Sequence, residues 1–147
     1  MVTLRPAPTA EIRASWQFFV TGIGEVIDKC GLDFHPADVY REITSGNGPV
    51  LFWIEKDDEI VGMTVICEEK DRYTERRSLL LDMTYLSPYA DCLEDLRDAI
   101  DNLAMSADVD YIEWFSPRDG WDRVMERIGY KSSYKAFARE VRHGYIK

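Results

Sequence analysis

A buried strand that leads into an amphipathic helix and then into a second strand restricts the fold of this chain most. Residues 79–86 (Leu-Leu-Leu-Asp-Met-Thr-Tyr-Leu) are almost continuously apolar and end at Ser87-Pro88. Apolar residues then recur at helical spacing from Leu93 to Ala107, and residues 111–115 have the composition of another strand. A strand–helix–strand unit of this kind predicts an α/β fold whose sheet is covered by helices.

The remaining segments complete a mixed sheet. We expect further strands at 2–5, 50–54, 60–67 and 130–141, and further helices from Thr9, from His35-Pro36 to Ser45, and at 121–128. Because Gly22 and Gly24 interrupt the first helical pattern, a break near Thr21 is expected. The sequence therefore predicts one domain over residues 1–147, with a mostly antiparallel sheet of about six to seven strands and about four helices.

Composition excludes several classes of protein. The 147 residues carry a net charge of −9, which would repel nucleic acids and anionic membranes over most of the surface. Three cysteines, none in a Cys-x-x-Cys pair, indicate neither a disulfide framework nor a zinc site, so we expect no metal and a reducing, cytoplasmic location. The charge is uneven, since residues 118–147 hold 8 Lys and Arg against 4 Asp and Glu.

Several local patterns, taken with the order of elements, resemble the GNAT superfamily of acyl-CoA-dependent N-acyltransferases. The segment from Trp121 to Tyr130 is similar to the late helix of that family, which ends in an apolar residue, Gly and an aromatic residue. Residues 137–141 (Phe-Ala-Arg-Glu-Val) resemble its closing strand, and residues 86–88 (Leu-Ser-Pro) resemble the end of its fourth strand. The resemblance covers nearly the whole chain.

The resemblance implies a site and a reaction. The co-substrate would be acetyl-CoA or another acyl-CoA, bound between the fourth and fifth strands, with its pantetheine arm on the backbone of Thr84, Tyr85 and Leu86. The acceptor would be a small-molecule amine or a protein amine. Asp82 lies where family members place the carboxylate that deprotonates the amine, and a leucine-rich strand would raise the pKa of this group toward useful base strength.

The phosphate-binding loop departs from the family pattern. It falls on residues 89–96, but no glycine occurs between Leu79 and Tyr111. Amide N–H groups approach a phosphate closely only where no side chain blocks them. Asp91-Cys92-Leu93-Glu94 instead predicts a capping box, in which Asp91 and Glu94 satisfy the helix N-terminus themselves. An acyl-CoA would then need another grip on its pyrophosphate, for which Arg118 and Arg123 are the candidates.

The proton donor to the leaving thiolate also differs from the family. The position that holds a tyrosine in the family is Met125, which cannot transfer a proton. Tyr130 is the candidate substitute, with Tyr134 and Tyr85 as alternatives. Two hypotheses follow: an N-acyltransferase with an atypical or weakened CoA site, or a degenerate, non-catalytic GNAT-fold binding or structural protein of a kind that phages also encode. A homodimer and a complex with a protein partner are compatible with both.

Overall fold

The computed structural model describes residues 1–115, 121–132 and 139. Its elements, in chain order, are β1 (Val2–Pro6), α1 (Thr9–Ala14), α2 (Trp16–Cys30), α3 (Pro36–Thr44), β2 (Val50–Lys56), β3 (Glu59–Lys70), β4 (Arg77–Leu86), α4 (Leu93–Ala107), β5 (Tyr111–Trp114) and α5 (Trp121–Arg127). The strand expected at 130–141 lies mostly outside the described residues, and residues 130–132 form no strand.

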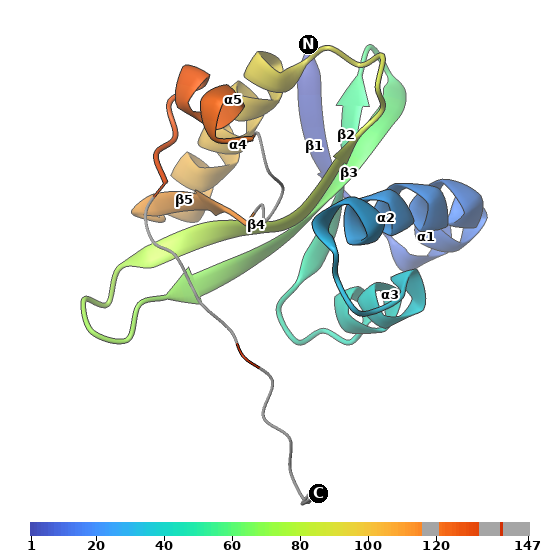
Figure 1. Cartoon of the computed structure of the whole chain (residues 1–147), viewed down its shortest axis with the longest axis horizontal. Coiled ribbons are helices and arrows are strands. Elements are labelled where there is room, and N and C mark those ends of the chain that lie inside the picture. Colours follow the sequence, from blue (N-terminus) through green and yellow to red (C-terminus); the bar gives the residue numbers. More distant parts are fainter. Residues whose placement is uncertain (116–120, 133–138, 140–147) are drawn as a thin grey trace, which may run out of the picture.

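A mixed, mostly antiparallel sheet forms the centre of the molecule (Figure 1). In the described part of the chain it has five strands in the order β1-β2-β3-β4-β5. Strands β1 to β4 pair antiparallel, whereas β4 and β5 pair in parallel across the crossover helix α4. The predicted α/β class is thus confirmed, although the described sheet has fewer strands and the described chain one more helix than expected.

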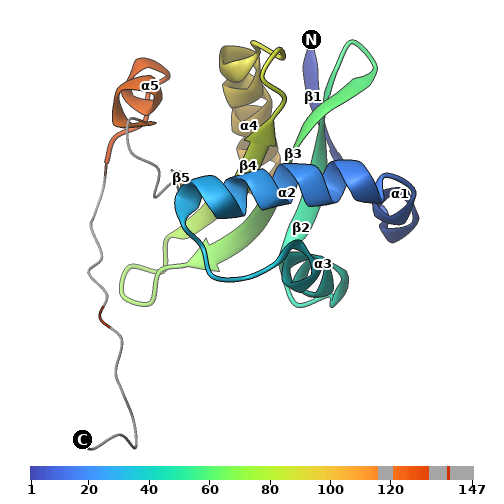
Figure 2. The ribbon, with the colours of Figure 1, turned by 45° about the vertical axis from the view of Figure 1, so that its right-hand side comes forward.

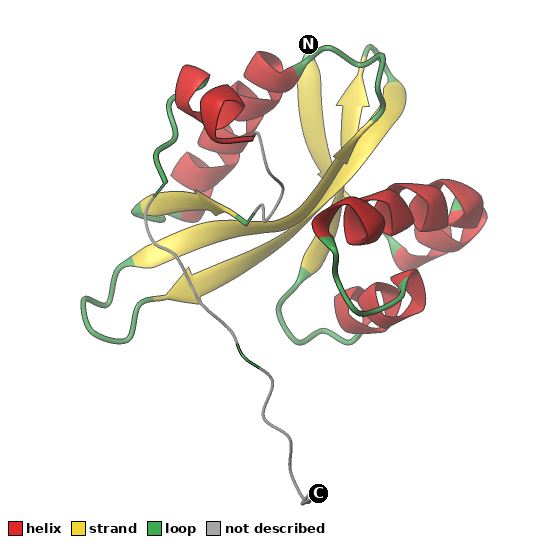
Figure 3. Ribbon diagram, in the orientation of Figure 1, coloured by secondary structure: helices red, strands yellow, loops and turns green. Residues whose placement is uncertain are grey.

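Helices cover both faces of the sheet (Figures 2 and 3). Helix α2 crosses one face together with α1 and α3, and its buried stripe of Phe19, Ile23 and Ile27 packs against Trp53 and other residues of the sheet. Helix α4 covers the opposite face, where its buried residues form a second core with β1 and β4. Each face of the sheet therefore has its own apolar core.

The break expected near Thr21 is wrong. The interruption lies at Ser15, between α1 and α2, and α2 continues unbroken through Gly22. A Cβ atom on Gly22 would lie 2.7 Å from Met63 Cε and 2.8 Å from Tyr85 Cδ2. This glycine therefore lets the helix approach the sheet closely.

An irregularity in β4 sets the position of the candidate base. Val65 pairs with Met83 and the next residue, Ile66, pairs with Leu81, so Asp82 is an extra residue without a partner on β3. Such a β-bulge bends the strand and redirects a side chain. The bulge lies where the pairing between β4 and β5 ends.

Candidate active site

Strands β4 and β5 pair over a short stretch only. Residues Ser78–Leu81 pair with Tyr111–Trp114, and the Phe115 N–H donates to the Leu81 carbonyl at 3.0 Å. From Asp82 to Leu86 the outer edge of β4 has no strand partner among the described residues. A strand edge of this kind offers backbone donors and acceptors to a ligand. The predicted pantetheine-binding residues Thr84, Tyr85 and Leu86 all lie on this edge.

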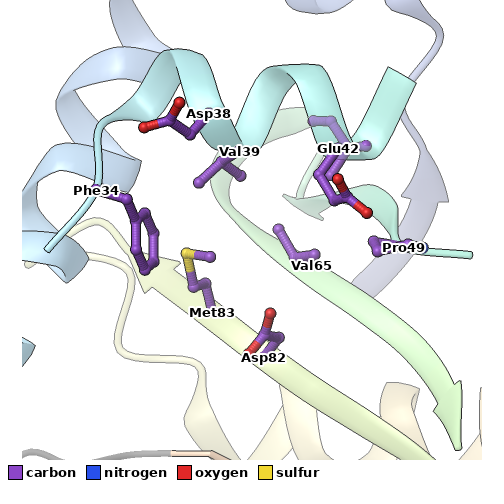
Figure 4. A pocket seen from close by; sticks show the side chains of 9 residues that line it. Phe34, Asp38, Val39, Glu42, Pro49, Val65, Asp82 and Met83 are labelled. Atoms are coloured by element: carbon purple, nitrogen blue, oxygen red, sulfur yellow. The ribbon is translucent and has the colours of Figure 1, made fainter. Parts of the chain in front are cut away.

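Asp82 lies beside a cavity at the start of the unpaired edge (Figure 4). The cavity has a volume of about 220 Å³ and lies between β4, the neighbouring strand β3 and helix α3. Its walls are mainly apolar and include Phe34, Val39, Val65 and Met83. The remaining lining residues are Asp38, Glu42, Ile43 and Pro49. A carboxylate in such surroundings is only partly hydrated.

The environment makes Asp82 a stronger base than an ordinary aspartate. Burial raises the pKa of its carboxyl group, and the negative charge of Glu69 adds to the effect. The described residues supply no hydrogen bond or ion pair that would offset this increase. The sequence-based expectation for the pKa of Asp82 therefore agrees with its position in the structure.

Two further carboxylates line the cavity, and neither was expected there from the sequence. The Asp38 carboxylate accepts from the His35 N–H at 2.9 Å and lies 3.3 Å from Arg41 Nη1, which lowers its pKa. Glu42 is exposed and points from the same helix toward the cavity (Figure 4). Their spacing of four residues on a predicted helix was a usable signal, because such residues share a face. The cavity thus combines apolar walls with negative charge.

The side chains of the unpaired edge alternate between the two cores. Tyr85 packs against α2, with its ring centroid 6.0 Å from that of Phe18, and Leu86 packs against the core beneath α4. The Thr84 hydroxyl lies 2.9 Å from the Thr64 hydroxyl of β3. The ring of Tyr85 is therefore partly buried beneath α2, and its backbone lies on the unpaired edge.

The other predicted site residues lie elsewhere. Tyr130 follows α5 and packs edge-on against Trp114, with ring centroids 5.8 Å apart. Burial raises the pKa of its hydroxyl group. Trp114 packs against the core beneath α4, whereas Asp82 faces the cavity beneath α3, so the structure does not bring Tyr130 and Asp82 together. Arg123 is exposed on α5, and Arg118 lies outside the described residues.

The predicted capping box at the start of α4 is wrong. The helix begins at Leu93 with Cys92 as its N-cap, and no side chain caps it. Asp91 instead adopts a positive φ of 40°, a conformation that favours glycine. Glu94 and Asp95 lie in the first turn, where their charges oppose a bound diphosphate. Lys56 brings a positive charge nearby, but its ammonium group donates to the Ala90 carbonyl at 2.8 Å.

The described residues show neither a metal cluster nor a membrane span. No group of three or more His, Cys, Asp or Glu residues within them is placed to hold a metal ion. None of the helices in this part of the chain is long and apolar enough to cross a membrane.

Comparison with known proteins identifies the fold. No family model matches the sequence, and no curated protein matches it. The structure is similar to a ribosomal-protein-alanine N-acetyltransferase from Brucella melitensis biovar Abortus 2308, with a TM-score of 0.71 at 12% identity over 96% of this chain and 99% of the other. A GNAT family acetyltransferase from Staphylococcus aureus gives a TM-score of 0.67 at 14% identity over 95% and 98%.

A third similar structure is the aminoglycoside acetyltransferase meta-AAC0020 from an uncultured soil metagenomic sample, in complex with sisomicin. It gives a TM-score of 0.67 at 9% identity over 96% of this chain and 97% of the other. All three similarities extend over nearly the full length of both chains. The chain has the GNAT acetyltransferase fold, as the sequence resemblance indicated.

Proposed function

We propose that this protein is an N-acyltransferase that transfers an acetyl or other acyl group from CoA to an amine. One observation carries the proposal: the unpaired edge of β4 begins at the bulge that holds Asp82, beside a cavity. This places a carboxylate with a raised pKa next to a surface suited to an extended, amide-containing ligand. The acceptor would be a small-molecule amine or a protein amine, bound in the cavity.

The fit to acyl-CoA differs between the two ends of that molecule. The edge from Thr84 to Leu86 suits the pantetheine arm, because peptide-like amides pair with a free strand edge. The start of α4 suits the diphosphate poorly, because its first turn is acidic. The candidates for binding the pyrophosphate remain Arg123 and Arg118, of which Arg118 lies outside the described residues. We therefore expect acyl-CoA to bind mainly through its pantetheine arm, with modest affinity.

The residues of the site would act as follows. Acyl-CoA supplies an activated thioester when it is bound. Asp82 takes a proton from the acceptor ammonium, so that the free amine attacks the thioester carbonyl and the CoA thiolate leaves. Tyr130 is the donor that the sequence predicts for that thiolate; because its ring packs against Trp114 on the face of the sheet opposite the Asp82 cavity, the thiolate would have to leave toward that face. The negative charge of Asp38 and Glu42 attracts a cationic amine to the cavity.

Calorimetry and a transfer assay test this proposal. Acetyl-CoA titrated to near-millimolar concentration should release or absorb heat and raise the melting temperature. Amines presented with acetyl-CoA should then be acetylated, and Asp82→Asn should reduce kcat strongly while leaving acetyl-CoA affinity intact. The matched control is Asp71→Asn, which changes an aspartate in the distant β3–β4 turn. A full transfer rate in Asp82→Asn would remove Asp82 as the base.

The second candidate function is a non-catalytic GNAT-fold protein that binds a partner or has a structural role. The acidic first turn of α4 and the methionine at position 125 favour it. Absence of both heat and thermal shift with acetyl-CoA would support this alternative over the transferase.

A further inference from the structure

A pair of threonines joins the unpaired stretch of β4 to the neighbouring strand β3. Thr64 on β3 and Thr84 on β4 are direct cross-strand neighbours, and their hydroxyl oxygens are 2.9 Å apart. Thr64 is fully buried, with none of its surface exposed, whereas Thr84 is partly exposed. The pair therefore extends from the interior of the sheet to the unpaired stretch of β4.

Burial of Thr64 determines which hydroxyl donates. Each hydroxyl carries one hydrogen and can accept two, and within the described residues Thr84 is the sole side-chain partner of Thr64. If Thr84 donated, the hydrogen of Thr64 would stay buried without an acceptor, which is unfavourable. The satisfied arrangement has Thr64 donating to Thr84. Among the residues that the structure describes, nothing then accepts the hydrogen of Thr84, and the bond to Thr64 restricts the direction of that hydrogen.

The free hydrogen lies beside the stretch of β4 that lacks a strand partner. Met83 and Tyr85 point into the core beneath α2, so alternation directs Thr84 to the opposite face of the sheet. β5 pairs with β4 only as far as Leu81. We propose that Thr84 is a directed hydrogen-bond donor to an amide carbonyl of the pantetheine arm of acyl-CoA, with Thr64 as the positioning residue. This inference rests on the proposed function.

A double variant separates binding from folding. Thr64→Val with Thr84→Val replaces both hydroxyls by methyl groups of similar shape, which leaves no unsatisfied partner and should preserve the urea midpoint. Calorimetry should show that acetyl-CoA binds this variant about tenfold more weakly than wild type, the loss expected for one hydrogen bond. Thr64→Val alone keeps the Thr84 hydroxyl but no longer fixes its direction, so it should bind acetyl-CoA about threefold more weakly than wild type; affinity equal to wild type would remove Thr64 as the positioning residue.

The single variants test the direction of the hydrogen bond. Thr84→Val should be less stable than Thr64→Val, because only the former leaves a buried hydroxyl without its acceptor. The reverse order of stability would overturn the assigned direction. Unchanged acetyl-CoA affinity in the double variant would overturn the role of Thr84 while leaving the transferase proposal in place. Failure of the wild-type protein to bind acetyl-CoA would instead refute the transferase proposal itself.

Discussion

The two glycines of α2 allow a direct test of how closely this helix packs on the sheet. Gly22 and Gly24 both lie in the interior of the helix. A Cβ atom at Gly22 would lie 2.7 Å from Met63 Cε and 2.8 Å from Tyr85 Cδ2. At Gly24 the nearest atom would be Pro36 Cγ at 3.9 Å, which is an ordinary van der Waals contact. A glycine-to-alanine substitution therefore causes a clash at position 22 but has room for its methyl group at position 24.

The expected free energies follow from these distances. Alanine in place of glycine inside a helix stabilises by about 1 kcal/mol, so Gly24→Ala should raise the free energy of unfolding by that amount. Gly22→Ala gains the same stabilisation from helix propensity, but its methyl group forces the ring of Tyr85 to move. Overpacking of this kind costs about 1–3 kcal/mol. The helix-propensity term cancels between the two variants. Their difference, about 1–3 kcal/mol, measures the clash alone.

Urea unfolding followed by circular dichroism provides the measurement. Both variants should show the wild-type m-value, so that the difference in midpoint reports stability. Movement of the Met63 methyl group alone would relieve one contact at little cost, but the Tyr85 ring also packs against Phe18 of the same helix and cannot move as freely. If Gly22→Ala were as stable as Gly24→Ala, the close approach of α2 to β4 would be refuted.

Three further predictions concern ionisable residues. Asp82→Asn should raise the free energy of unfolding at pH 7, because the raised pKa of Asp82 makes its charged form unfavourable in the folded state. This gain should shrink as the pH falls through the raised pKa of Asp82 and should be lost below about 4, where the carboxyl group is protonated in the unfolded state as well. Asp71→Asn should destabilise at pH 7, because that carboxylate accepts two backbone N–H groups and has a lowered pKa. Asp91→Gly should be more stable than Asp91→Ala by about 1 kcal/mol in urea unfolding, because only glycine adopts a positive φ without strain; equal stabilities would contradict the backbone conformation of the loop. Tyr130→Phe should unfold at a urea concentration no lower than wild type, since its buried hydroxyl has no hydrogen-bond partner among the described residues, and an unchanged kcat in the same variant would exclude Tyr130 as the proton donor.

Periodicity and turn residues predicted most of the described elements but not how they pack. The helical stripe of α2 and the run of β4 were identified correctly because apolar spacing is a local property. The break at Thr21 was wrong because Gly22 serves a contact with Tyr85, which is distant in the sequence. The capping box was wrong for a related reason: its residue types are present, yet the loop places Asp91 at a positive φ and leaves Cys92 as the N-cap.

The candidate site could be predicted only in part. Asp82 stood out as an acid within an apolar strand, and its raised pKa agrees with that expectation. The cavity beside it could not be predicted, since Phe34 and Val65 meet Asp82 only when α3 packs against the sheet. The bond between Thr64 and Thr84 depends on the register of β3 and β4, which a bulge shifts by one residue.

The bulge in β4 has a consequence for how such a protein can evolve. Asp82 has no partner residue on β3, whereas its neighbours Leu81 and Met83 both pair with that strand. Exchanging its side chain therefore leaves the pairing of the neighbouring residues intact. A lineage could gain or lose a carboxylate at this position by a single substitution, with little change in the ability of the chain to fold. The residue at position 82 can therefore change during evolution independently of the strand pairing. The fold can persist while the activity changes.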